Sequence, residues 1–155
     1  MRIALLVIPE EPAPELNVRP KAVFPVETAQ AAALLSGAGH DVFCRDLNLF
    51  PPARWMDEIH AFLNDSRTDV LAATPQFLTF NIRESHRIVQ EAFTAAKRFN
   101  PAMTTVLAGA YATSFPDRAL SETGATHVLR GEFEFSLAKL VDQLTRDFRF
   151  GVTSC

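Results

Sequence analysis

Four histidines and two cysteines are the residues of this chain most able to bind a metal or move a proton. His60 and His86 fall on two separate predicted helices, and His127 falls in a predicted strand. His40 follows a glycine that is expected to end a helix. No two of them have metal-ligand spacing with each other or with a cysteine, so we expect structural or solvated histidines and no metal site. Cys44 lies in a predicted buried strand, which favours an inert core thiol.

Motifs for covalent or phosphate chemistry are absent from the sequence. Ser85, Ser136 and their neighbours form no Gly-x-Ser-x-Gly turn, so a hydrolase triad has no support. Neither Gly-x-Gly-x-x-Gly nor Gly-x-x-x-x-Gly-Lys-Ser/Thr occurs, which argues against dinucleotide and nucleoside-triphosphate sites. We therefore predict no catalytic residues, and no enzyme activity for this chain on its own.

Small residues follow two predicted strands at the points where those strands end. Thr74 comes after Ala72-Ala73, and Ala108-Gly109-Ala110 closes a later strand. Such residues let a flat or elongated ligand approach the backbone, but they also permit close packing of strands on helices. Both interpretations stay open. The tripeptide 130–132, Arg-Gly-Glu, is explained without a ligand, because its glutamate falls in the first turn of a helix.

Apolar runs and helical periodicities alternate along the chain. The predicted strands are 3–8, 41–46, 70–73, 105–108 and 126–129. Helical patterns occupy 26–35, 51–63, 81–99 and 133–144, and a short helix is expected to begin near 114–117. Each crossover places a helix on the sheet, so the order predicts an α/β fold with a doubly wound, five-stranded parallel sheet. The stretch 9–25 holds five prolines and is predicted to be a long loop after the first strand.

Composition restricts the class of protein. The 155 residues are 48% hydrophobic and 21% charged, which fits one globular domain. A net charge of −3 without a run of Lys or Arg argues against nucleic acid and membrane surfaces as partners. No segment approaches the roughly 20 apolar residues that span a bilayer. Two cysteines make no disulfide framework and suit a reducing compartment, so we expect a cytoplasmic protein.

Several segments, taken in order, resemble the cobalamin-binding domain that precedes the catalytic barrel in B12-dependent radical SAM enzymes. Segments 24–29 and 32–42, with Asp46, resemble its opening. Segment 69–74 resembles its third strand with a Ser/Thr end, and segment 106–113 with Pro116 resembles its Gly-Gly-x-x-Ala-Thr segment. Segment 128–134 resembles its Arg-Gly-Glu-Gly-Glu segment. The resemblance covers roughly residues 1 to 144, and the order and spacing of the segments make it specific.

The resemblance implies a flavodoxin-like, Rossmann-like B12-binding fold with strand order 2-1-3-4-5. The corrin ring would lie over the carboxyl edge of the sheet, with the nucleotide tail beside strands three and four. The cofactor-binding residues expected from this placement are Thr74, Phe77, Thr79, Ala108, Gly109, Ala110, Tyr111, Gly131 and Glu132. The Asp-x-His-x-x-Gly motif is absent and the loop 9–25 has no histidine, so a His-off cobalamin is implied. We expect a cobalamin-binding-like domain over 1–148 and a tail over 149–155.

Three departures from the family pattern bear on function. Ala108 stands in place of a glycine beside the expected tail channel, and Phe133 replaces a glycine and would put a large ring close to the ligand edge. No Cys-x-x-x-Cys-x-x-Cys motif occurs, so this chain is expected to hold no iron–sulfur cluster.

These features leave three hypotheses. The first is a cobalamin-binding module, of the His-off type, that serves a radical SAM-type methyltransferase or related catalytic partner. The alternative is a degenerate B12-like domain that acts as an interaction scaffold without cofactor, which Ala108, Phe133 and the 13 phenylalanines would favour. A receiver-like domain is the third; Glu10, Glu11 and Asp46 imitate its acidic cluster, but its lysine after strand five is missing.

Overall fold

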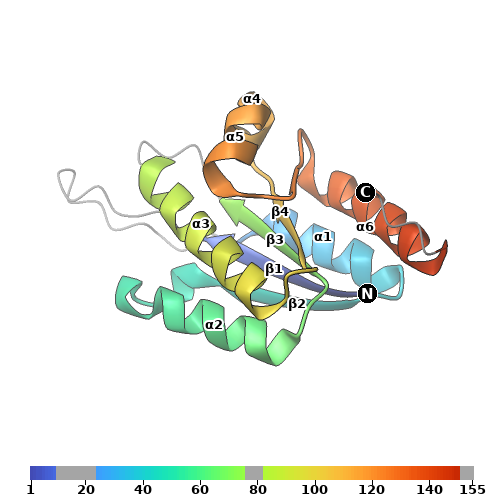
Figure 1. Cartoon of the computed structure of the whole chain (residues 1–155), viewed down its shortest axis with the longest axis horizontal. Helices are drawn as coiled ribbons and strands as arrows, with labels where there is room; N and C mark the ends of the chain where they lie inside the picture. The colour runs from blue at the N-terminus through green and yellow to red at the C-terminus, as the bar shows by residue number, and fades with distance from the viewer. Residues whose placement is uncertain (10–23, 76–81, 151–155) are drawn as a thin grey trace.

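The computed structural model describes residues 1–9, 24–75 and 82–150 (Figure 1). Five parallel strands form one sheet in the order β2-β1-β3-β4-β5. The strands are β1 (Arg2–Ile8), β2 (Asp41–Asp46), β3 (Val70–Pro75), β4 (Thr104–Leu107) and β5 (His127–Val128). The predicted doubly wound parallel sheet and its strand order are confirmed.

Strand β1 lies between β2 and β3, near the middle of the sheet. Leu5 pairs with Cys44 on one side and with Ala72 on the other. Residues 3–8 are fully or almost fully buried, because helices cover both faces of a parallel sheet. This double burial explains why the β1 sequence is a continuous apolar run without alternation.

The helices divide between the two faces of the sheet (Figure 1). They are α1 (Val26–Gly37), α2 (Trp55–Ser66), α3 (Ile82–Phe99), α4 (Ala110–Ser114), α5 (Pro116–Thr123) and α6 (Phe133–Phe150), with the 3-10 turns η2 (Leu47–Leu49) and η3 (Pro52–Arg54). Helices α1 and α6 pack together on one face, whereas α2, α3 and α5 cover the other. None of these helices, within the described part of the chain, is long and apolar enough to cross a lipid bilayer.

Apolar side chains fill both faces of the sheet. The α2/α3/α5 face holds large helical side chains, among them Ile59, Phe62 and Phe93. On the α1/α6 face, the small residues Ala72 and Ala108 share a cluster with larger side chains of α1 and α6.

At three places the local prediction differs from the structure. Helix α4 was not predicted, whereas the short helix expected to begin near 114–117 is α5, with Pro116 as its first residue, where its missing N–H costs no hydrogen bond. Strand β5 keeps only two of the four expected residues. Cys44 is exposed rather than buried, because β2 is an edge strand of the sheet. Asn81, at which the helix over 81–99 was expected to begin, lies outside the described residues.

Candidate cofactor-binding site

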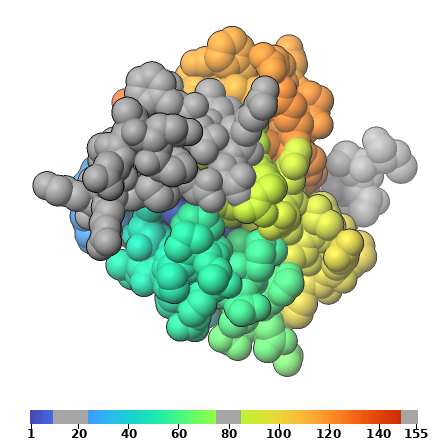
Figure 2. Space-filling view, turned by 90° about the vertical axis from the view of Figure 1, so that its left-hand side faces the viewer, coloured from blue at the N-terminus to red at the C-terminus, as the bar shows by residue number. Residues whose placement is uncertain are grey.

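The carboxyl ends of all five strands meet at one edge of the molecule, since the strands are parallel. In α/β sheets of this kind, ligands bind beyond this edge. Figure 2 looks toward it, and residues of α2 (teal), α3 (yellow-green) and α4–α5 (orange) come to the surface there. The site predicted from the sequence lies where β3 and β4 reach this edge.

Two threonine hydroxyls meet at the end of β3, on the α1/α6 side. Thr28 lies in the first turns of α1 and Thr74 near the end of β3, and their Oγ1 atoms are 3.2 Å apart. The Thr74 hydroxyl is also 3.5 Å from the carbonyl oxygen of Leu6, to which it donates. Both threonines are buried, with 4% and 7% of their surface exposed. This pair of hydroxyls therefore lies inside the fold, at the strand end where Thr74 was expected to bind the cofactor.

Thr28 was missed by the sequence prediction. Its spacing of three and seven residues from Ala31 and Leu35 places all three on one face of α1, and that face is buried. A polar residue on a buried helical face needs a hydrogen-bond partner. That periodicity is the signal by which Thr28 could have been found.

The turn after β4 is joined to the turn after β5 by one side chain. Thr113 Oγ1 donates to the carbonyl oxygen of Gly109 at 3.0 Å and accepts from the backbone N–H of Gly131 at 3.0 Å. Gly109 and Gly131 have φ angles of 107° and 77°, a region that residues with a Cβ atom rarely adopt. Thr113 thus fixes two turns, both at the carboxyl edge, relative to one another. The sequence prediction included both glycines but not Thr113.

Phe133 packs inward, beside the carboxyl edge of the sheet. Its side chain is buried, with 3% exposed, in the same cluster as Ala108, Val106 and Leu137. Phe133 is the first residue of α6, and the buried face of that helix continues at Leu137 and Val141. The four-residue spacing directs the ring inward against the sheet. The extra methyl group of Ala108 points into the same core.

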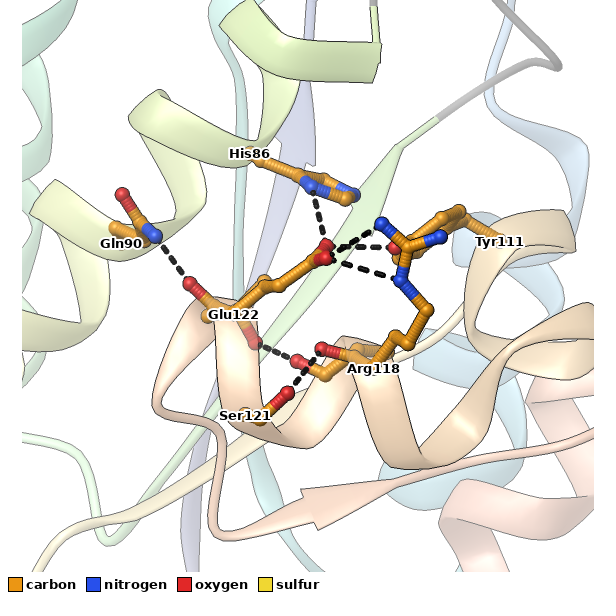
Figure 3. A network of polar contacts seen from close by, with 8 residues as sticks. His86, Gln90, Tyr111, Arg118, Ser121 and Glu122 are labelled. Atoms are coloured by element: carbon orange, nitrogen blue, oxygen red, sulfur yellow. Dashed lines mark hydrogen bonds and ion pairs between the residues drawn. The ribbon is translucent and has the colours of Figure 1, made fainter.

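Tyr111 turns away from the hydroxyl pair, toward the opposite face of the sheet (Figure 3). Its hydroxyl donates to Glu122 Oε2 at 2.6 Å, and its ring meets that of His86 with centroids 4.3 Å apart. Arg118 donates to Glu122 Oε1 from Nε at 3.1 Å and from Nη2 at 2.9 Å. Thr74 and Tyr111, predicted to share one site, therefore lie on different faces of the sheet.

The same contacts shift the protonation equilibria of the network. Hydrogen bonds from Tyr111 and Arg118 lower the pKa of Glu122, which is an anion at neutral pH. Burial, together with the bond to that anion, raises the pKa of Tyr111. Burial lowers the pKa of His86 more than the nearby carboxylate of Glu122 raises it. The network therefore holds one carboxylate, one cationic guanidinium, a neutral phenol and a neutral imidazole.

The remaining predicted residues give a mixed result. Ala110 and Glu132 lie at the carboxyl edge with exposed side chains. Phe77 and Thr79 lie outside the described residues. The structure brings together Thr74, Ala108 and Gly109 at the ends of β3 and β4.

The histidines are scattered. His40 precedes β2 with its Nδ1 atom 3.3 Å from the amino group of Met1, and His127 begins β5. Both therefore lie at the amino edge of the sheet, opposite the candidate site. His86 contacts Tyr111 and Glu122, and His60 is exposed on α2. Where the structure describes the chain, no three His, Cys, Asp or Glu side chains gather as metal ligands.

An all-parallel sheet of order 2-1-3-4-5, flanked by helices on both faces, defines a flavodoxin-like α/β domain that binds ligands at its carboxyl edge. Comparison with family models makes the assignment specific: the B12 binding domain matches residues 16–141. The chain belongs to this family of cobalamin-binding domains. A comparison with curated proteins returned no match.

The residues at the edge fit the polar part of a cobalamin. The nucleotide tail of this cofactor carries ribose and phosphate oxygens, which hydroxyl and backbone N–H donors can bind. Thr28 and Thr74 supply hydroxyls, and the extended turn at Gly109 exposes backbone without a side chain in the way. The small residues Ala72 and Ala108 line the same face.

Proposed function

We propose that this chain is a cobalamin-binding module that holds the nucleotide tail of the cofactor at the ends of β3 and β4. The observation that carries the proposal is the buried Thr28–Thr74 hydroxyl pair at the carboxyl end of β3, in a chain of the B12 binding domain family. A buried hydroxyl at this edge can form a further hydrogen bond when a polar ligand enters.

Each part of the candidate site has a function in this proposal. Thr74 donates or accepts a hydrogen bond with the tail, while Thr28 keeps the Thr74 side chain in place. Gly109 lets the tail approach the backbone, and Thr113 holds the two glycine turns at a fixed separation. When bound, cobalamin supplies a cobalt centre that can carry a methyl group.

We further propose that the cobalamin is His-off and that the module serves a radical SAM-type methyltransferase or related catalytic partner. The stretch 9–25 after β1 contains no histidine. His40 and His127 lie at the amino edge, and His86 is already packed against Tyr111 and Glu122. The catalytic partner is proposed from the resemblance of segments 24–42, 69–74, 106–113 and 128–134 to the domain that precedes the catalytic barrel in B12-dependent radical SAM enzymes.

The test is a titration of the purified protein with hydroxocobalamin, followed by its visible spectrum and by co-elution in gel filtration. We expect saturable, stoichiometric binding at micromolar protein. Reduction to cob(II)alamin then allows the axial ligand to be examined by electron paramagnetic resonance. We expect no splitting from a histidine nitrogen, and the variants His86→Ala and His127→Ala should give the wild-type spectrum. A nitrogen splitting that either variant removes would refute the His-off assignment.

One observation favours the second candidate function, an interaction scaffold without cofactor. Phe133 and Ala108 fill the space between α6 and the sheet with buried apolar atoms, close to where the tail would run. If wild-type protein neither changes the cobalamin spectrum nor co-elutes with it, and the variant Phe133→Gly does, then the ring blocks the channel and the scaffold is the better account.

A further inference from the structure

The turn at Gly109 is followed by α4, a helix of only five residues. An isolated helix of this length is unstable in water, because its few hydrogen bonds do not offset the conformational entropy lost when the first turn forms. Helix α4 also lacks a side-chain cap at its N-terminus. Contacts with the rest of the molecule must therefore hold it, and with it the Gly109 turn.

Three consecutive residues make those contacts, each in a different direction. Ala112 is fully buried in the core of the α2/α3/α5 face. Thr113 ties the Gly109 carbonyl to the turn at Gly131. Tyr111 reaches across to α5 and α3 through the network of Figure 3. Ala112 anchors α4 in the core. The position of α4 along the surface of that core then depends on the contacts of Thr113 and Tyr111.

The Tyr111 contact is the stronger of these two lateral anchors. Its hydroxyl bonds to a carboxylate at 2.6 Å, and hydrogen bonds to charged groups are roughly twice as strong as neutral ones. Glu122 is itself held in place, since Arg118 binds its other oxygen through two nitrogens. The rings of His86 and Phe115 lie 4.3 Å and 5.5 Å from the Tyr111 ring, and they limit its movement.

We infer that Glu122 is a positioning residue: through the Tyr111 hydroxyl it sets the position of the β4–α4 turn against which the cofactor tail packs. This inference rests on the proposed function and adds Glu122, which is not among the residues proposed to contact the tail. Glu122 acts from α5, on the α2/α3/α5 face, whereas the Thr28–Thr74 pair lies on the α1/α6 face. The network would thus couple the helices on one face of the sheet to a site on the other face.

The first test needs no cofactor. Amide hydrogen exchange is followed at Thr113 and Gly131, whose N–H groups bond to the Gly109 carbonyl and the Thr113 hydroxyl. Tyr111→Phe and Glu122→Ala should each speed exchange at both amides by roughly tenfold, the factor for one hydrogen bond to a charged group. Leu5 in β1 should exchange as in the wild type, which separates a local effect from global loss of stability. Glu122→Gln keeps a carbonyl acceptor without the charge, so it should speed exchange by only about threefold.

The second test measures the affinity for hydroxocobalamin. Tyr111→Phe and Glu122→Ala should each weaken binding by about threefold or more, and the double variant should be no weaker than the stronger single one, because both remove the same contact. Asp142→Asn is the matched control: it removes another surface i,i+4 ion pair, with Arg146 on α6, and should change neither affinity nor exchange.

The outcomes separate the two proposals. Exchange that is unchanged in both variants, or that rises equally at Leu5, contradicts positioning by Glu122. Faster exchange with unchanged cobalamin affinity also contradicts it, because the turn would then be irrelevant to the tail. If the wild type binds no cobalamin, the proposed function fails, and with it the assignment of this turn to a cofactor.

Discussion

Thr74 is the side chain on which the candidate site depends most directly. Inside the fold, its hydroxyl lies against the Thr28 hydroxyl and donates to the carbonyl oxygen of Leu6. Thr74→Val keeps the shape and removes the hydroxyl, so cobalamin affinity should fall by about 1 kcal/mol, roughly fivefold in Kd. Thr94→Val, at an exposed position of α3, is the control and should leave Kd unchanged. Full affinity in Thr74→Val would place the tail elsewhere.

Gly109 adopts a backbone conformation that excludes most substitutions. With φ 107° and ψ −176° it occupies a region that is essentially restricted to glycine. Gly109→Ala should therefore lower the free energy of unfolding by about 1–3 kcal/mol. A bulky residue here would strain the turn as well as fill a channel, so its effect on binding alone would be ambiguous.

Gly37 offers the matched control for that measurement. It ends α1 without a positive φ, and a Cβ added there meets no atom within 4 Å. Gly37→Ala should be neutral or stabilising by up to about 1 kcal/mol. Urea unfolding of both variants checks the pair, and an unaltered stability of Gly109→Ala would contradict the strained turn.

For single residues, the sequence predicted where a residue lies along its strand but not the direction in which its side chain points. Thr74 was found because strand ends of a parallel sheet share one edge. The inward ring of Phe133 and the outward thiol of Cys44 depend on which helix covers which strand. The direction of Tyr111 depends on Glu122, eleven residues away on another helix.

Among the secondary-structure elements, β2 and α2 are joined by a buried carboxylate. Glu58 on α2, whose side chain is 7% exposed, bonds to Arg45 on β2 at 2.8 Å and pairs with Arg54 one helical turn away. Arg45→Met should lower the free energy of unfolding by about 1–3 kcal/mol, because a mostly buried charge loses a partner. Arg54, with 60% of its side chain exposed, contributes less, and Arg54→Met should cost about 0.5 kcal/mol. Equal losses in urea unfolding would contradict this assignment.

The sequence predicted the long elements better than the short ones. Five strands and the main helices follow from apolar runs, helical periodicity and the prolines and glycines between them. Helix α4 has five residues and no periodicity of its own, and contacts with α5, the core and the Gly131 turn hold it in place. Such an element exists only because of its tertiary contacts, which no local pattern reveals.

For the whole molecule, the lowered pKa values of three histidines determine how we expect stability to depend on pH. Burial is the largest cause of the lowered pKa of His40, His86 and His127. As pH falls through about 6.5, the unfolded chain takes up protons that the folded chain does not, so the free energy of unfolding decreases. Urea unfolding between about pH 7.5 and 5.5 should show this decrease, above the range in which carboxylates titrate. His127→Gln should reduce the slope, and a stability that rises toward pH 5.5 would refute the prediction.

The central claim is that the molecule holds cobalamin by its nucleotide tail at the ends of β3 and β4. Comparing the affinities for cobalamin and for cobinamide, which has the corrin ring but lacks the nucleotide, tests it most directly. A ligand held through the tail should bind at least about tenfold more tightly than its truncated form, because the hydrogen bonds and buried contacts of the tail are lost together. Equal affinity for both corrinoids, or no binding of either, would contradict the account.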